Sequence, residues 1–184
     1  MLDEGIQVTS SNELGKRIGI TPVQVRKDLA IFGQFGMKGI GYFTNELLFY
    51  IEKIIGLQNH WNVAIIGMGH LGVALANYQN LPTLGFKIEA LFDSNEEIIG
   101  TTINDIKVSN VKNLRLIVNK RDIKICVIAV PAREAQGIVN LLSTTKIKGI
   151  WNFAPIQLDV PSHIKIVNED LSMHLSMLSY MISN

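Results

Sequence analysis

Cysteine, long apolar runs and net charge are all scarce in this chain of 184 residues. The single cysteine, Cys126, excludes a disulfide scaffold, and its apolar neighbours favour a buried structural thiol over a reactive one. No apolar run approaches the roughly 20 residues that a membrane helix needs, so we expect no membrane span. The first residues lack a basic, apolar leader, and a cytoplasmic location is the default expectation.

The formal net charge of +1 restricts nucleic-acid binding. Proteins that bind DNA mainly through its phosphates usually carry a visible excess of Lys and Arg. Any DNA affinity must therefore come from a local cluster of cations. With 47% hydrophobic and 18% charged residues, the chain otherwise has the composition of an ordinary globular protein, long enough for one large domain or two small ones.

The chain changes character at a short polar segment, residues 57–60. Helical patterns and a glycine-rich hairpin precede it, and apolar strand-like runs that alternate with helices follow it. Such runs indicate a parallel sheet covered on both faces. We therefore predict an α/β chain with a small helical domain over 1–57, a Rossmann-type domain over 61–168 and a C-terminal helix over 169–184.

Two helix starts are well marked in the first part. Ser10 begins a capping box that Glu13 completes, which predicts a helix over 10–18. Thr21 followed by Pro22 predicts a second helix over 21–34. The short break between them contains a glycine and is typical of a helix-turn-helix.

The second helix has two different faces. An apolar stripe that can pack inward is formed by Val25, Leu29 and Phe32. The other side is small, partly apolar and cationic, with Val23, Arg26, Lys27 and Ala30. This face suits a major groove about 12 Å wide, and a solvated basic face on a helical domain is the alternative.

Three glycines within residues 36–41 predict a tight hairpin with Lys38 at its tip. A wing beside a recognition helix is the favoured interpretation, and a flexible interdomain loop is the alternative. Thr44 or Asn45 is then expected to cap a helix over 45–56. The apolar residues that close this domain are expected to be Leu47, Leu48, Ile51, Ile54 and Ile55.

A buried strand, a glycine loop and a helix start follow one another over residues 61–76. Gly67 suits the tight turn, Gly69 lets the backbone approach a pyrophosphate, and Gly72 permits close packing of helix on strand. The helix N-terminus adds free amides and partial positive charge. We predict that this loop binds a dinucleotide, with Met68, His70 and Leu71 as its other residues.

A second strand ends at Asp93, about 20 residues beyond Gly72, where a carboxylate can accept hydrogen bonds from ribose hydroxyls. It would repel a 2′-phosphate, and no arginine follows within 94–97, so NAD is favoured over NADP. A tight turn that binds nothing is the alternative for the glycines, and a plain strand-end turn is the alternative for Asp93. Two further apolar runs, 125–132 and 148–155, are expected to contact the nicotinamide half through Val130, Pro131, Asn152 and Phe153.

The last helix, over 170–183, has apolar stripes on nearly opposite sides. One consists of Leu171, Leu175, Leu178 and Ile182, and the other of Met173, Met177, Tyr180 and Met181. If either stripe stayed in water, about 100 Å² of unburied apolar surface would forgo roughly 2.5 kcal/mol. The helix should therefore lie between bodies. Exchange between the subunits of a homodimer and burial between the two domains of its own chain both satisfy this.

These segments together resemble the Rex family of redox-sensing transcriptional repressors. The resemblance lies in residues 19–21, 25–28, 32–36, 38–42, 67–72, 92–93, 130–132, 148–150 and 152–155. It implies an N-terminal winged helix-turn-helix domain, a Rossmann NAD(H)-binding domain and a C-terminal helix exchanged between the subunits of a homodimer. Such a protein binds an inverted-repeat operator, represses genes of fermentation and anaerobic respiration, and releases the DNA when NADH replaces NAD⁺.

The resemblance also implies roles for single residues. Lys38 would contact DNA from the wing, and Asp170 would lie near the domain interface. The recognition helix would contact DNA through Arg26 and Lys27, with Thr21 and Gln24 beside them. Two departures matter: the family's usual first helix, rich in Arg and Tyr, is absent before Asp3, and His70 stands where an asparagine is common. A loop histidine suits a polar residue near phosphates, and we assign it no catalytic role.

Two other functions share parts of the pattern. A small NAD-dependent dehydrogenase would need a catalytic domain and an acid–base pair, such as His–Asp or Tyr–Lys, and neither is discernible, so we expect no enzyme activity. A CoA-binding module, like the nucleotide-binding half of acyl-CoA ligases, shares the strand, the glycine loop and the fold. Asp93 favours NAD over this alternative.

Overall fold

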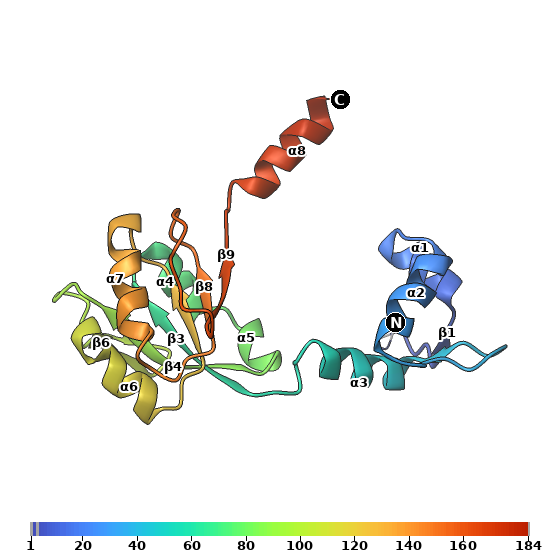
Figure 1. Cartoon of the computed structure of the whole chain (residues 1–184), viewed down its shortest axis with the longest axis horizontal. Coiled ribbons are helices and arrows are strands. Elements are labelled where there is room, and N and C mark those ends of the chain that lie inside the picture. The colour runs from blue at the N-terminus through green and yellow to red at the C-terminus, as the bar shows by residue number, and fades with distance from the viewer. Residues whose placement is uncertain (1, 3, 184) are drawn as a thin grey trace. The chain divides into compact units, whose positions relative to one another are not determined.

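The computed structural model describes residue 2 and residues 4–183, and it is drawn in Figure 1. The chain divides into two compact units, Met1–Asn59 and His60–Asn184. Within the described residues, no helix is both long and apolar enough to cross a membrane.

The first unit consists of three helices and a two-stranded sheet. The helices are α1 (Ser11–Ile18), α2 (Pro22–Phe32) and α3 (Thr44–Ile54). The strands β1 (Val8–Thr9) and β2 (Tyr42–Phe43) pair in antiparallel fashion, so the hairpin that follows α2 returns to the segment that precedes α1.

Both predicted helix starts are present. The Ser10 hydroxyl accepts the N–H of Glu13, and the Thr21 hydroxyl accepts the N–H of Gln24, each at 3.2 Å. The Glu13 carboxylate accepts a hydrogen bond at 2.9 Å from Arg17 on the same helix. Arg17 also binds Glu4 at 2.6 Å, and this hydrogen bond lowers the pKa of Glu4 to about 2. The two helices therefore begin where local chemistry satisfies their first amides.

Three expectations about this unit are wrong. The helix α2 ends at Phe32 because Gly33 leaves helical geometry with a φ of 141°, and Phe32 is 58% exposed while Val25 is 5% exposed. The cap of α3 is Phe43, since the Thr44 hydroxyl donates to the carbonyl of Ile6 instead. Of the apolar residues expected to close the domain, Leu47 is buried and Ile51 is half-buried, but Leu48, Ile54 and Ile55 are exposed.

The glycine-rich segment forms the predicted hairpin. Met37 and Gly41 exchange two backbone hydrogen bonds, at 2.8 and 3.0 Å, which leaves Lys38, Gly39 and Ile40 in the turn. Gly41 has a φ of 112°, and a Cβ there would lie 2.3 Å from the carbonyl oxygen of Thr9. Only glycine fits this close crossing of the hairpin and β1.

The second unit is built on a seven-stranded sheet in the order β5-β6-β4-β3-β7-β8-β9. The strands are β3 (Trp61–Ile66), β4 (Phe86–Asp93), β5 (Thr102–Ile103), β6 (Ile106–Asn110), β7 (Ile125–Ile128), β8 (Gly149–Asn152) and β9 (Lys165–Asn168). Among the described strands of this sheet, only β5 pairs antiparallel, with β6. The chain extends the sheet from β3 first on the β4 side and then on the β7 side, so a topological switch point lies at β3.

Helices lie on both faces of this sheet. They are α4 (His70–Ala76), α5 (Asn80–Thr83), α6 (Leu114–Lys120) and α7 (Ala132–Leu142), with a 3-10 turn at Val111–Asn113. Ala64 and Ile66 of β3 pack with α6 and α7, whereas Val63 and Ile65 pack on the side of α4. This alternation along one strand is what a sheet buried on both faces requires.

Cys126 lies in the core beside α6 and α7, with no exposed surface, and burial raises the pKa of its thiol. The expected burial of Cys126 is therefore confirmed. The last helix, α8 (Met173–Ser183), has no buried residue among those described.

Candidate dinucleotide and DNA sites

The glycine loop between β3 and α4 has the geometry that its three glycines predict. Gly67 has a φ of 96°, and a Cβ on it would lie 2.5 Å from the carbonyl oxygen of Ala129 on the neighbouring strand end. A Cβ on Gly72 would lie 1.8 Å from the carbonyl oxygen of Gly67. A Cβ on Gly69 would meet no atom of the described residues within 4 Å. Gly67 and Gly72 therefore serve the packing of the loop, and Gly69 faces open space where a ligand can approach.

Asp93, at the end of β4, is joined to this loop. One of its carboxylate oxygens accepts the N–H of Met68 at 2.6 Å, and the other accepts the N–H of Asn95 at 2.7 Å. A carboxylate oxygen offers two lone pairs, so each oxygen retains capacity for one more donor. The half-buried carboxylate is thus oriented and still able to accept ribose hydroxyls.

A cavity of about 300 Å³ lies at the carboxyl ends of β3, β4 and β7. Its wall includes Gly67, Gly69, Asp93, Val130 and Pro131, all predicted from the sequence. Six residues that were not predicted from the sequence also line it: Ser94, Asn95, Ile98, Val111, Glu134 and Ile138. The apolar members can hold a flat base, and Asp93 supplies the polar end for a sugar.

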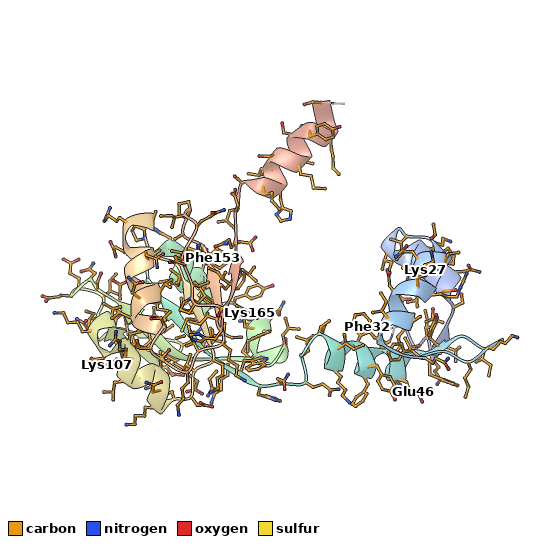
Figure 2. All side chains as sticks on the ribbon, in the orientation of Figure 1. Lys27, Phe32, Glu46, Lys107, Phe153 and Lys165 are labelled. Carbon is orange, nitrogen blue, oxygen red and sulfur yellow. The ribbon has the colours of Figure 1, made fainter. Side chains whose placement is uncertain are left out.

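The candidate DNA-binding residues lie in the first unit. Arg26 donates from Nη1 to the Ser11 hydroxyl at 2.8 Å, and the Gln24 amide donates to the Asp28 carboxylate at 2.5 Å. Lys27 is exposed on α2 (Figure 2). A groove of about 540 Å³ is lined by the start of α1, the second half of α2 and the hairpin, including Lys38. The predicted helix-turn-helix and wing thus form the walls of one groove.

Known proteins match the whole chain. The redox-sensing transcriptional repressor Rex of Clostridium perfringens strain SM101 is 43% identical over 184 residues, which are 100% of this chain and 87% of the relative. Rex of Chloroflexus aurantiacus strain J-10-fl is 42% identical over 183 residues, 100% of this chain and 86% of the relative. The chain belongs to the Rex family.

Solved Rex-family structures share the fold. RSP, a Rex-family repressor, in complex with β-NAD⁺ and operator DNA matches with a TM-score of 0.94 at 37% identity, over 99% of this chain and 84% of RSP. RSP with β-NADH matches with a TM-score of 0.91 at 36% identity, over 99% and 85%. A family model described as a CoA binding domain matches residues 58–156, and one described as a putative DNA-binding protein N-terminus matches residues 1–30. The predicted fold, a winged helix-turn-helix followed by a Rossmann-type domain, is confirmed.

Four of the residues predicted to bind the cofactor lie away from the cavity wall in this Rex-family chain: Met68, His70, Leu71 and Gly72. The Met68 side chain is buried in the core beside α4, so only its backbone faces Asp93. Gly72 is buried. His70, the first residue of α4, is exposed, and Leu71 follows it half-buried. None of the four lines the cavity that holds Asp93, so their contact with a cofactor stays a prediction.

The two residues predicted at the end of β8 lie in different surroundings. Asn152 is 0% exposed: its amide nitrogen donates to the carbonyls of Ala154 and Ile156 and to Asn168 Oδ1, and its oxygen accepts the N–H of Ala154. Phe153 packs on Trp151 with ring centroids 4.5 Å apart. Asn152 therefore anchors the loop after β8 in this structure. Phe153 lines a second cavity of about 730 Å³.

Two more features of the second unit bear on the predictions. The Ser172 hydroxyl donates to Asp170 Oδ1 at 2.6 Å, and its N–H donates to the same oxygen at 2.9 Å. These bonds hold the pKa of the Asp170 carboxyl below its ordinary value. Among the described residues, no group of His, Cys, Asp and Glu is arranged to hold a metal ion.

Proposed function

We propose that this Rex-family chain is an NADH-responsive repressor, which binds an inverted-repeat operator as a homodimer and leaves it when NADH binds. The observation that carries the proposal is the cavity of about 300 Å³ in which Gly69 and Asp93 meet, in a chain that also holds a helix-turn-helix with a wing. RSP has been solved with β-NADH, and with β-NAD⁺ and operator DNA.

The cavity supports NAD(H) by its chemistry. Ribose hydroxyls donate to the free lone pairs of Asp93, the adenine lies between the apolar walls that include Ile98 and Val111, and the diphosphate passes over the backbone at Gly69. Glu134, on the same wall, adds a second carboxylate. Two acids disfavour the 2′-phosphate of NADP. The cytoplasm, where NAD(H) and DNA meet, is the location we propose.

The division of labour that we propose follows the sequence prediction. Residues 1–57 bind DNA through α2 and the wing, residues 61–168 bind the cofactor, and residues 169–184 hold the dimer together. Arg26, Lys27 and Lys38 supply the cations, with Thr21 and Gln24 beside them. The chain is a regulator and not an enzyme, and the relatives support this because they are named as transcriptional repressors.

The switch itself is a shift between two arrangements of the dimer. NADH draws the cofactor domains together and misplaces the two recognition helices relative to half-sites about one or two DNA turns apart. For nearly complete release, NADH must favour the closed arrangement by about 10⁴-fold.

CoA is the second candidate ligand, because the family model that matches residues 58–156 is described as a CoA binding domain. A CoA ligand has no requirement for an acid at the end of β4. Asp93, already oriented by the Met68 and Asn95 amides, is therefore the observation that favours NAD(H).

The test is a titration of the full chain on a fluorescent duplex selected by this protein from a randomised pool. We expect saturating NADH to release the duplex, NAD⁺ to leave it bound, and CoA and NADPH to have little effect. Asp93→Ala should lose the response to NADH and keep operator binding, whereas Glu96→Ala, which changes an exposed acid three residues on, should behave as the parent. Operator binding that is unchanged by saturating NADH would refute the proposal, and release by CoA alone would favour the second candidate.

A further inference from the structure

Arg26 is tied to the start of the preceding helix. Its Nη1 donates to the hydroxyl of Ser11, the first residue of α1, at 2.8 Å. The guanidinium thus crosses from α2 to α1, and its other N–H groups remain available. The Ser11 hydroxyl accepts this bond, which leaves its own hydrogen free to donate.

The helical geometry of α2 separates Arg26 from its neighbour Lys27. Residues turn by about 100° each around an α-helix, and Val25 marks the buried side with 5% exposure. Lys27 stands about 200° from Val25, near the middle of the outward face. Arg26 stands about 100° away, on the flank where the bond to Ser11 draws it toward α1.

The flank of Arg26 opens into the groove of about 540 Å³ between α1, α2 and the wing. Ser10, Ser11, Arg26 and Lys38 all line this groove, and none of the described residues that line it is acidic. Two cations and two hydroxyl residues on one concave surface form an environment for a phosphodiester. The edge of a base would instead meet the outward face of α2.

We propose that Arg26 binds a phosphate of the operator backbone in this groove, that Ser11 positions it there, and that base reading on α2 falls to Lys27. This rests on the proposed function, because it assigns roles within operator binding. Phosphate contacts carry no direct sequence information and depend strongly on salt, whereas base contacts set specificity. The two roles therefore have different signatures.

The test measures dissociation constants of the full chain for the selected operator and for a scrambled duplex of equal length, at several KCl concentrations. The variants are Arg26→Ala, Lys27→Ala, Ser11→Ala and Ser11→Thr. NAD(H) affinity and thermal unfolding of each variant show that the fold and the cofactor site are intact. A selection that yields no duplex would refute the proposed function, and with it this inference.

Arg26→Ala should weaken both duplexes by a similar factor and reduce the slope of log K against log salt by about 0.9 per chain. Lys27→Ala should lower the ratio of specific to scrambled affinity by about tenfold. Ser11→Ala should reproduce part of the Arg26→Ala effect, about threefold on both duplexes. Ser11→Thr should restore parent-like affinity because the hydroxyl returns.

Loss of the specificity ratio in Arg26→Ala with an unchanged salt slope would overturn the assignment of Arg26. Parent-like binding by Ser11→Ala would overturn the positioning role.

Discussion

The carboxylate of Asp93 accepts the backbone N–H of Met68 at 2.6 Å. This bond joins the end of β4 to the glycine loop that follows β3, two neighbouring strands at the centre of the sheet. The second oxygen of Asp93 is held at 2.7 Å by the N–H of Asn95. Both the loop and the carboxylate are therefore oriented before a cofactor arrives, which lowers the entropy that binding must overcome.

Asp93→Ala should weaken NADH binding at least tenfold, because two charge-assisted hydrogen bonds to ribose and the support of the loop are lost together. It should also narrow the preference for NADH over NADPH, since the repulsion of a 2′-phosphate falls. Calorimetry with both nucleotides measures the two effects. Glu96→Ala is the control. An unchanged NADH affinity in Asp93→Ala would show that the carboxylate serves only the turn.

The elements that the sequence predicted well depend on neighbours close in the chain. Ser10 and Thr21 cap their helices through amides three residues away, and Gly67 and Gly72 meet within one loop. Thr44 was misassigned as a cap because its hydroxyl bonds to Ile6, a partner 38 positions away that no local pattern reveals. The strands β5, β6 and β9 were not predicted, since none of them is a continuous apolar run and they carry exposed polar residues such as Lys107 and Lys165 (Figure 2).

An alanine at Gly69 should affect NADH binding, whereas an alanine at Gly72 should affect the stability of the protein. Gly69→Ala places a Cβ in open space at a φ of −73°. The free energy of unfolding of the free protein should therefore change by no more than about 1 kcal/mol, while NADH affinity falls. Gly72→Ala forces a Cβ to within 1.8 Å of the Gly67 carbonyl, so it should destabilise the free protein itself. Thermal unfolding with and without NADH separates the two. Equal effects on the free protein would contradict this geometry.

The residues predicted for the cofactor site line the cavity where they lie just beyond a strand end, and depart from the expectation where burial decides. Val130 and Pro131 follow β7 directly and line the cavity as the rule for parallel strands requires. Asn152 ends β8 in the same way, but its amide turns inward and makes four hydrogen bonds to three residues, which the sequence cannot show. Glu134 was missed because only the start of α7 brings it to the cavity wall, although its place three residues after Pro131 was a usable signal.

Asn152→Ala should lower the free energy of unfolding by about 2–3 kcal/mol, since it leaves buried backbone groups of the loop after β8 without partners. Its effect on NADH affinity should be smaller than that of Asp93→Ala. Asn168→Ala is the matched control, because it removes one of the same hydrogen bonds from an exposed residue and should cost less. Denaturant unfolding and calorimetry give both numbers. A variant with parent-like stability and lost NADH binding would assign Asn152 to the cofactor directly.

The helix α8 should hold the dimer together through both of its apolar stripes. Leu175 and Met177 lie on opposite stripes and are 69% and 55% exposed in the single chain, which is unfavourable for apolar groups unless a partner covers them. Leu175→Glu and Met177→Glu should each yield monomers and abolish binding to an inverted repeat. Ser179→Glu, which places the same charge between the two stripes, should stay dimeric. Light scattering after gel filtration measures the mass. If the helix instead packs between the domains of its own chain, the two variants would unfold more readily without any change in mass, because the lost contacts would then be internal to one subunit.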